Sequence, residues 1–417
     1  MSVASFARLG TSNSYDNTIA NLQSRQNKLS TLQEQLTSGK KITSPSDDPT
    51  GAAQAERALN RLARIATDQR ALESQRNAIS QAEGTLADVT DVLQQIRDLA
   101  SSTGNGTFSN SDRKTVALQI TGLRDRLIDL ANTKDSNGQP LFAALGSALK
   151  PFVGPAVSPD YSFDGLPGSA AGDTYSIPGT LDGESAFMLQ PGRDAAYNVQ
   201  TSTGAKLSTD GVTLVNASQV PSNAKDLSYT IKNMVVTGNN VTYDVEVTDN
   251  TTTPPGAVVG GTGGITAPWS PSLGFTVTGV PGVSFNIKGT PAPTDTVTLD
   301  PNSSVFATVD KVISGITNAT NSSQANQAVS QALHNIDISI GRVAAVRGQA
   351  GDYLNRADII TSNNDKRNVE QEANRSRAED MDMIKGVSQF QNQQTGYQAA
   401  LQSYAQIQKL SLFNFIS

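Results

Sequence analysis

Proline divides this chain of 417 residues into three regions. All but two of its 18 prolines lie between Pro140 and Pro301, a region that also holds most of the Thr- and Gly-rich sequence. Because proline lacks a backbone donor and clashes with the preceding helical turn, long helices are expected only outside this region. Within it, alternating strand patterns such as "YTIKNMVVTGNNVTYDVEV" are separated by Gly, Pro and Asn turns. The sequence therefore predicts an α+β fold, with a mainly β domain inserted between two helical ends.

Each end of the chain carries an apolar seam with alternating spacings of four and three residues, the repeat that keeps one side of a helix against a partner helix. Gly39 supplies the left-handed residue that ends the first of these helices. We expect the two ends to pair as an antiparallel coiled coil. The seam residues are Tyr15, Ile19, Leu22, Gln26, Leu29, Gln33 and Leu36 at the start, and Met383, Val387, Phe390, Gln394, Tyr397, Leu401, Tyr404 and Ile407 near the end.

By periodicity alone, an ordinary helical core within one molecule is the simpler interpretation of these seams. Two features favour association with other copies instead. Gln26, Gln33 and Gln394 lie on the seams, and polar seam residues weaken a helix pair while restricting its register. An isolated pair of about 25 residues a side with so polar a seam buries little surface and is marginal in water. We therefore expect the terminal helices to order fully only when neighbouring copies cover them.

The stretch "TSGKKITSPSDDPTGAAQAERAL", Thr37 to Leu59, separates the first helix from a longer one. Asp48 is expected as the N-cap of the second helix and Pro49 as its first residue, and the dipole of that helix favours the charges of Asp47 and Asp48. Two adjacent carboxylates also suggest a cation site, but that signal is weak without further oxygen ligands. Helix-start chemistry is the better explanation of this pair.

Further helices and a hairpin are expected between the break and the β domain. The second helix ends at "SSTGNGTFSNS", and a third is expected to be capped within Ser109 to Ser111. Asn137-Gly138 is a strong hairpin signal. Helical spacing returns from Val329 to Leu354, before a polar span from Asn363 to Glu379. The expected domains are 1–43 with 372–417 for the terminal coiled coil, 44–148 with 303–371 for a helical bundle with a small β-hairpin, and 149–302 for the inserted β domain.

The side-chain inventory argues against an enzyme. The chain has no cysteine, which excludes disulfides, thiolate metal sites and cysteine nucleophiles. His334 is the only histidine, so a site built on two histidines is impossible, and its place beside Leu333 on a helix favours a structural role. The "GGTGG" run at Gly260 to Gly264 lacks the Lys-Ser/Thr of a phosphate loop and is interpreted as a flexible turn. We expect no catalytic residue, no metal and no cofactor.

Charge and hydropathy exclude several classes of partner. A formal net charge of −6 and a pI near 5.0 provide no basic stripe for a phosphate backbone, so nucleic-acid binding is not expected, and an acidic substrate is equally disfavoured. No run of roughly 18 apolar residues exists, so no membrane insertion is expected. The start, "MSVASFARLG", lacks the basic and apolar segments of a secretory signal. If the protein leaves a cell, it is expected to do so without a cleaved signal peptide.

Several stretches resemble one protein family. "LTSGKKITSPSDDPTGAAQA" followed by "LRDRLIDLANTKDSNGQPLFAALGS" resembles the N-terminal half of the bacterial flagellar hook-associated proteins of the hook–filament junction type, the third of these proteins, and more distantly flagellin. "GTPAPTDTVTLDPNSSVFATVDKVI" resembles the same family's return from its β domain to its helices. The ending "YAQIQKLSLFNFIS" resembles the family's C-terminus, with Leu410, Leu412 and Phe413 in its apolar positions. The resemblance covers roughly residues 1 to 147 and 285 to 417.

The resemblance implies a structural subunit that joins the flagellar hook to the filament. It implies export of the unfolded chain through the flagellar type III apparatus and assembly outside the cell. The implied partners are copies of the same chain, a neighbouring hook-associated protein on the hook side, flagellin on the filament side, and an export chaperone at the C-terminal helix. It also implies a flagellin-like division, in which a terminal coiled coil lines the core of the axial tube and a long-helix bundle forms the next shell.

Two sets of residues follow as candidates for function. The joint between the shells is expected at Gly39, Pro45, Asp47, Asp48 and Pro49. Head-to-tail association generates helical tubes, and each fully buried large side chain of the seams is expected to contribute about 1.5 to 3 kcal/mol to it. The expected assembly interface consists of Ile19, Leu22, Leu29, Leu36, Val387, Phe390, Tyr397, Leu401, Tyr404 and Leu410.

Three alternatives stay open. Flagellin, the filament subunit, is the nearest, and the "SPSDDP" and "GTPAPTDTVTL" text favours the junction protein over it. A flagellin-like enzyme with a protease in its variable domain is disfavoured because the middle region has no histidine for a zinc site. A surface adhesin would use the β domain to bind host glycan, with Trp269 and Tyr243 as a stacking platform. Aromatic residues in a β domain are more often part of its core.

Overall fold

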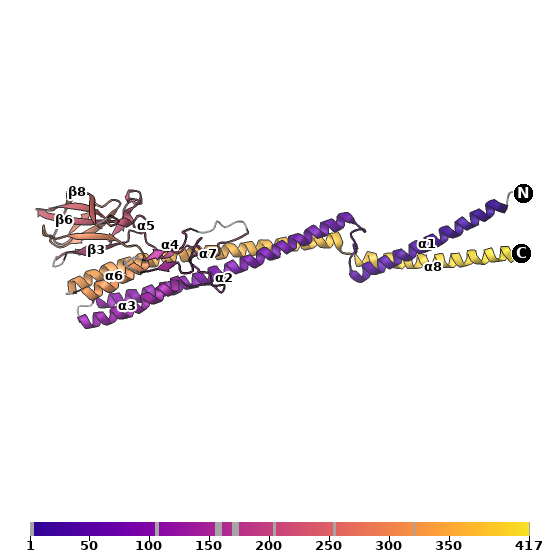
Figure 1. Cartoon of the computed structure of the whole chain (residues 1–417), viewed down its shortest axis with the longest axis horizontal. Helices are drawn as coiled ribbons and strands as arrows, with labels where there is room; N and C mark the ends of the chain where they lie inside the picture. The colour runs from indigo at the N-terminus through magenta and orange to yellow at the C-terminus, as the bar shows by residue number, and fades with distance from the viewer. Residues whose placement is uncertain are drawn as a thin grey trace. The chain divides into compact units, whose positions relative to one another are not determined.

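The computed structural model describes residues 4–104, 108–154, 161–168, 175–202, 206–252, 256–319 and 322–416. The chain forms two compact units, one made of Met1–Arg70 with Thr361–Ser417 and the other of Ala71–Ile360. Two long helices, α2 (Pro49–Thr103) and α7 (Ser322–Glu379), contribute residues to both units. The described part is helical at both ends and rich in strands in the middle, which confirms the predicted α+β fold (Figure 1).

In the first unit, α1 (Ala4–Ser38) and α8 (Met383–Ile416) lie side by side and run in opposite directions (Figure 1). This confirms the expected antiparallel pairing of the two ends. The same unit holds the start of α2 and the end of α7. The polar span from Asn363 to Glu379, expected to separate the last helix from the body, belongs to α7 instead. It stays helical because it contains neither Gly nor Pro, because Asn364 is buried and bonded to Gln69, and because Ala378 is buried as well.

The second unit has a helical core formed by α2, α7, α3 (Asn110–Ala131) and α6 (Val305–Asn318). The third helix begins as expected, because Ser109 is its N-cap and forms a capping box with Asp112. Apolar residues at helical spacing fill this core, and several are completely buried. They include Ile79, Leu86, Leu93, Ile96, Ile120, Leu127, Ile336 and Val343.

A loop-rich segment covers this core. The expected hairpin is present, with Lys134 bridged to Pro140 and Gly138 in the left-handed region at φ +79°. Beyond it, β1 (Phe152–Val153), β2 (Ser162–Phe163), α4 (Gly183–Phe187) and α5 (Pro191–Asp194) follow. The rings of Phe152, Phe187 and Phe306 pack together in the helical core. The β domain was expected from residue 149, whereas its own core begins at Ala195. The division into three domains stays a prediction.

Antiparallel strands form the β domain. In the described part of the chain, a five-stranded sheet has the order β3 (Tyr197–Thr201), β11 (Val297–Pro301), β6 (Leu227–Thr237), β7 (Asn240–Asp249), β8 (Ala257–Pro268). A smaller sheet is centred on β10 and enclosed with the first around one apolar core. Its strands are β4 (Ser208–Thr209), β5 (Thr213–Leu214), β9 (Phe275–Val277) and β10 (Val283–Lys288), and the short helices η1 (Ala217–Gln219) and η2 (Ala224–Asp226) precede β6.

Side chains of α7 hold a loop of the β domain by its backbone. Gln327 accepts a hydrogen bond from the amide of Thr209 at 3.0 Å, and Gln331 donates to the carbonyl of Asp210 at 3.0 Å. Nε2 of His334 lies 3.0 Å from the carbonyl oxygen of Val212. Gly211 fits between these contacts because a Cβ at this position would lie 2.3 Å from Cγ of His334. The sole histidine therefore serves the packing of the β domain on α7.

Candidate assembly interface and joint

The joint is the loop between α1 and α2. Gly39 has φ +71° and ends α1, as expected. Inside the loop, Oδ2 of Asp47 accepts hydrogen bonds from the Ser44 amide at 2.8 Å, the Thr43 amide at 3.1 Å and the Thr43 hydroxyl at 3.0 Å. The Ser44 amide, followed by the two Thr43 donors, holds the pKa of Asp47 below its usual value. One carboxylate thus fixes the turn that contains Pro45.

Asp48 caps α2, as expected. Its Oδ1 accepts from the Gly51 amide at 3.0 Å and the Thr50 amide at 3.1 Å, and Pro49 is the first helical residue. The Gly51 amide, followed by the Thr50 hydroxyl, lowers the pKa of Asp48. A Cβ at Gly51 would lie 2.5 Å from Oδ2 of Asp48 and 2.6 Å from Cδ1 of the buried Ile42, so the glycine leaves room for both side chains. The two adjacent aspartates thus serve the turn and the cap.

A second break, between α7 and α8, pairs with the first. The Met381 amide donates to the Gly39 carbonyl at 2.9 Å, and the Lys41 amide donates to the Glu379 carbonyl at 2.8 Å. Between these bonds, Lys40 lies opposite Asp380 in an antiparallel bridge, and its ammonium group forms an ion pair with Glu379. The two breaks between helices therefore form one hydrogen-bonded element, which we call the paired joint (residues 39–41 and 379–381).

The C-terminal half of the paired joint was not anticipated from the sequence. Asp382 caps α8 by accepting at Oδ1 from the amides of Ile384 at 3.1 Å and Lys385 at 3.2 Å. An Asp immediately before a helical apolar pattern is a recognised start signal, so this cap could have been found. The hydrogen bonds of Met381 with Gly39 and of Glu379 with Lys41 could not be found in this way, because they join segments that lie far apart in the sequence.

The terminal pair leaves its seams only half covered. On α1, Ile19, Leu22, Leu29 and Leu36 are half-buried, and so are Phe390, Tyr397 and Tyr404 on α8. Val387 is 43% exposed, Leu401 is 42% exposed, and the neighbouring Ile384 is 87% exposed. The seam glutamines Gln26, Gln33 and Gln394 all face solvent. The side chain of Leu410 lies outside the described ones. Two helices alone thus bring most of the expected interface residues together without burying them.

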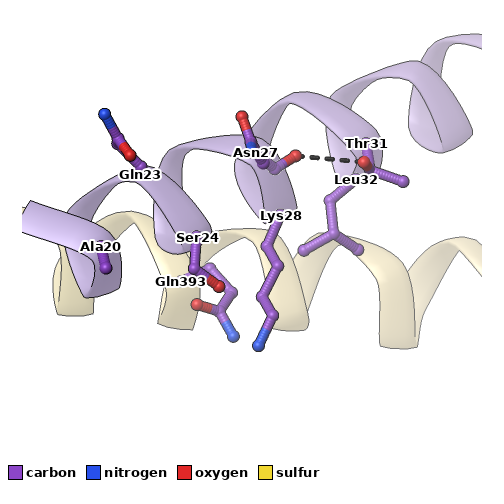
Figure 2. Close-up of a pocket in the computed structure, with 8 residues that line it drawn as sticks. All are labelled: Ala20, Gln23, Ser24, Asn27, Lys28, Thr31, Leu32 and Gln393. Carbon is purple, nitrogen blue, oxygen red and sulfur yellow. Dashed lines mark hydrogen bonds between the residues drawn. The ribbon is translucent and has the colours of Figure 1, made fainter. Parts of the chain in front are cut away.

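A polar groove runs along the terminal pair. It has a volume of about 580 Å³ and is lined almost entirely by α1, with Gln393 contributed by α8. Figure 2 shows Lys28 and Ser24 extending toward α8 beside Gln393, while the Thr31 hydroxyl donates to the Asn27 carbonyl at 3.0 Å. Its lining combines amides, hydroxyls and one ammonium group, with no carboxylate. The described lining of the groove therefore consists mainly of hydrogen-bonding groups.

Other chemistry finds little support in the described residues. No three His, Asp or Glu side chains among them are placed to hold a metal ion. None of the described helices combines the length and apolarity needed to cross a bilayer. The proposed stacking platform for a glycan is contradicted, because Tyr243 is completely buried and its hydroxyl accepts from the Thr278 amide at 3.2 Å. Trp269 packs against the same core and donates its indole N–H to the Gly289 carbonyl at 3.1 Å.

Comparison with known proteins places these helices in a family. Residues 10–146 match the bacterial flagellin N-terminal helical region, and residues 333–416 match the bacterial flagellin C-terminal helical region. The flagellar hook-associated protein 3 of Salmonella typhimurium is 33% identical over 153 residues, covering 35% of this chain and 46% of that protein. The B-type flagellin of Pseudomonas aeruginosa is 31% identical over 125 residues, covering 30% of this chain and 26% of that protein. The chain thus spans about half the length of the hook-associated protein it matches, and less of the flagellin.

Solved structures show the same fold. The flagellar hook-associated protein 3 of Legionella pneumophila superposes with a TM-score of 0.60 at 22% identity, covering 76% of this chain and 97% of that one. A FlgL structure from Xanthomonas campestris gives a TM-score of 0.53 at 22% identity, covering 77% of this chain and 99% of that one. The two matched helical regions together make up more than half of the sequence and stand at its two ends, in the order expected. The chain belongs to the bacterial flagellin family.

Proposed function

We propose that this chain is a structural subunit of the bacterial flagellum that joins hook to filament. The observation that carries the proposal is the half-covered seam of the terminal pair, in which Val387 and Leu401 stay more than 40% exposed. Flagellar hook-associated proteins of type 3 are among its relatives. The "SPSDDP" joint sequence favours the same choice.

Assembly is proposed to complete the seams. A pair of helices can bury only one side of each seam, whereas a ring of neighbouring pairs would cover the rest. Head-to-tail contacts, in which one surface meets a different surface of the next copy, close into rings or continue as tubes. Because burial of a large apolar side chain contributes about 1.5 to 3 kcal/mol when complete, finishing a half-buried seam adds roughly half of that per residue. The driving force therefore comes from many modest contributions along α1 and α8.

The proposed location is the hook–filament junction outside the cell, reached without a cleaved signal peptide. There the partners would be copies of this chain, a hook-associated protein on the hook side and flagellin on the filament side. Before export, α8 is proposed to bind a chaperone, because an amphipathic helix with exposed Ile384 and Leu401 suits a hydrophobic groove. The paired joint is proposed to connect the terminal pair in the inner shell to the helices of the next shell.

Aspartates in the seam test the proposal. The double variant Leu401→Asp with Tyr404→Asp should leave the β domain folded, because neither residue lies in its core. It should abolish addition to isolated hook ends, since two charges would have to be buried among neighbours. The control variant Gln398→Asp with Gln402→Asp adds the same charge on exposed positions of the same helix and should add normally. Normal incorporation of the seam variant would rule out the seam as the assembly surface.

Flagellin itself is the second candidate, because flagellins match at nearly the same identity as the hook-associated protein. Electron microscopy after incubation with a precipitating salt and short filament seeds separates the two. A junction protein should stay soluble and add only a short collar to hook ends. Long filaments grown from this chain alone would assign it to the filament instead.

A further inference from the structure

Three arginines converge in a groove between α2 and α7 within the first unit. The groove has a volume of about 340 Å³ and is lined by the guanidinium-bearing Arg57, Arg61 and Arg377. The buried Ala58 and Ala378 also line it, and their small side chains leave room for the groove. The remaining lining residues are Gln54, Gln371 and Asn374, so the groove contains no carboxylate. We call it the arginine groove.

The arginine groove is unusual because nothing in the described part of the chain neutralises it. Arg61 donates to the amide oxygen of Gln371 at 3.4 Å, and Arg377 donates to the amide oxygen of Asn374 at 2.6 Å and to the carbonyl of Ala373 at 3.2 Å, so all these acceptors are uncharged. Arg57 has no polar partner among the described residues. Glu56, the nearest acid in sequence, bonds to Asn60 and does not line the groove. Three guanidinium groups that form no ion pair with any described residue, in a chain of net charge −6, point to an anionic partner.

The same chain exposes a matching row of carboxylates. Asp88, Asp91 and Asp98 lie on one face of α2, because their spacings of three and seven residues bring side chains onto the same side of a helix. All three are exposed and form no ion pair with any described residue. Some other acids on or facing this helix do have cationic partners, as Glu83 has in Arg347 and Asp337 has in Arg97. We call these three residues the acidic row.

We propose that the arginine groove of one copy receives the acidic row of a second copy. Guanidinium groups bind carboxylates through two parallel hydrogen bonds, which fixes orientation as well as affinity. The contact joins two different surfaces, so it leaves a free groove and a free row for further copies and can continue from subunit to subunit. Charge pairs of this kind chiefly set the register and the rate of association. The inference rests on the proposed function and adds a register-setting contact to the apolar seams.

A charge exchange tests the contact. Arg57→Glu with Arg61→Glu, and separately Asp88→Lys with Asp91→Lys, should each lower incorporation at hook ends at least about tenfold, because attractive pairs become repulsive. The variant that carries all four changes should recover to within about threefold of the natural sequence, because every pair is attractive again. As a matched control, Arg64→Glu with Arg70→Glu changes the same charge outside the groove and should have little effect. Circular dichroism checks that each variant is folded.

The outcomes separate this inference from the proposed function. If the natural sequence fails to add to hook ends, the proposed function fails. If it adds and the reversed variants add equally well, only the contact is refuted. If the variant with all four changes did not recover incorporation, the occupant of the groove could not be the acidic row of a second copy. Another acidic protein or a free anion would then have to fill the groove. Inorganic phosphate that inhibits the natural sequence while the charge exchange has no effect would likewise overturn the proposal.

A cross-link gives an independent reading without hooks. Because the chain has no cysteine, Arg61→Cys and Asp91→Cys can be made on separate copies and mixed. Mild oxidation should give the mixed dimer at least about fivefold faster than either dimer of identical copies, and salt should remove the difference, since exposed charge pairs are screened. Equal rates for all three dimers would contradict the contact.

Discussion

Gly211→Ala should destabilise the β domain, although the backbone at this position suits alanine. The new Cβ would lie 2.3 Å from Cγ of His334 and 2.4 Å from its Nδ1, so the imidazole itself has to move rather than a flexible tip. Overpacking of this kind costs about 1 to 3 kcal/mol. If the ring turns away instead, its contact with the Val212 carbonyl is lost, at about 0.5 to 1.5 kcal/mol. We therefore expect a loss of about 1 to 2 kcal/mol.

The sign of this effect should depend on His334. In a His334→Ala background the obstacle is gone, and alanine then restricts the unfolded chain, a gain of about 0.4 to 1 kcal/mol. Gly211→Ala should thus be neutral or stabilising in that background. Denaturant unfolding followed by fluorescence measures this directly, because the only tryptophan, Trp269, lies in the β domain. An equal loss in both backgrounds, or no loss in the natural one, would refute the packing argument.

Three further predictions concern the joint and a helix start. Lys40→Cys with Asp380→Cys should form a disulfide, because residues opposed in an antiparallel bridge lie within disulfide range. The oxidised protein should be incorporated normally, because the joint is expected to stay closed. If only the reduced form were incorporated, the joint would have to open during assembly. Folding lowers the pKa of both Asp47 and Asp48, so the stability that their carboxylates contribute is complete at neutral pH and is lost below about pH 4. Asp47→Asn and Asp48→Asn should therefore reduce the fall of the melting temperature at acid pH. An unchanged dependence of the melting temperature on pH would contradict this. Ser109→Ala should remove the cap of α3 and cost about 0.5 to 2 kcal/mol in calorimetry, where an unaltered melting temperature would argue against the cap.

Local signals in the sequence were sufficient wherever a single turn decides the structure. Gly39 ends α1 because only a left-handed residue closes the helix there, and Asp48 with Pro49 starts α2 because both side chains suit a first turn. The same holds for Ser109 and for the Asn137-Gly138 hairpin. The proline distribution correctly separated the helical ends from the strands. Each of these features depends on residues close together in sequence.

Long-range pairing was beyond such reasoning. Pro-rich text suggested that Phe152 and its neighbours belong to the β domain, but the aromatic rings pack among helices, and composition does not reveal which core a ring joins. The expected interface residues follow a periodic pattern that is visible in the sequence. The arginine groove has no such pattern, because it combines α2 with a segment of α7 about 310 residues away, as the contact between Arg61 and Gln371 illustrates. The polar sequence of that segment does not reveal that it continues α7 and packs against α2.

The paired joint depends on residues from two segments that lie far apart in the sequence. The Lys41 side chain donates to the carbonyl of Arg377, 336 residues away in the sequence. The loop between α1 and α2 therefore cannot form this hydrogen bond until the end of α7 is present. A copy that lost its last forty residues would keep its core yet leave α1 without a partner and the joint without its second strand. Such a copy would be distinguishable from an intact one by its loose end alone. Formation of these hydrogen bonds therefore requires the C-terminal segment as well as the N-terminal one.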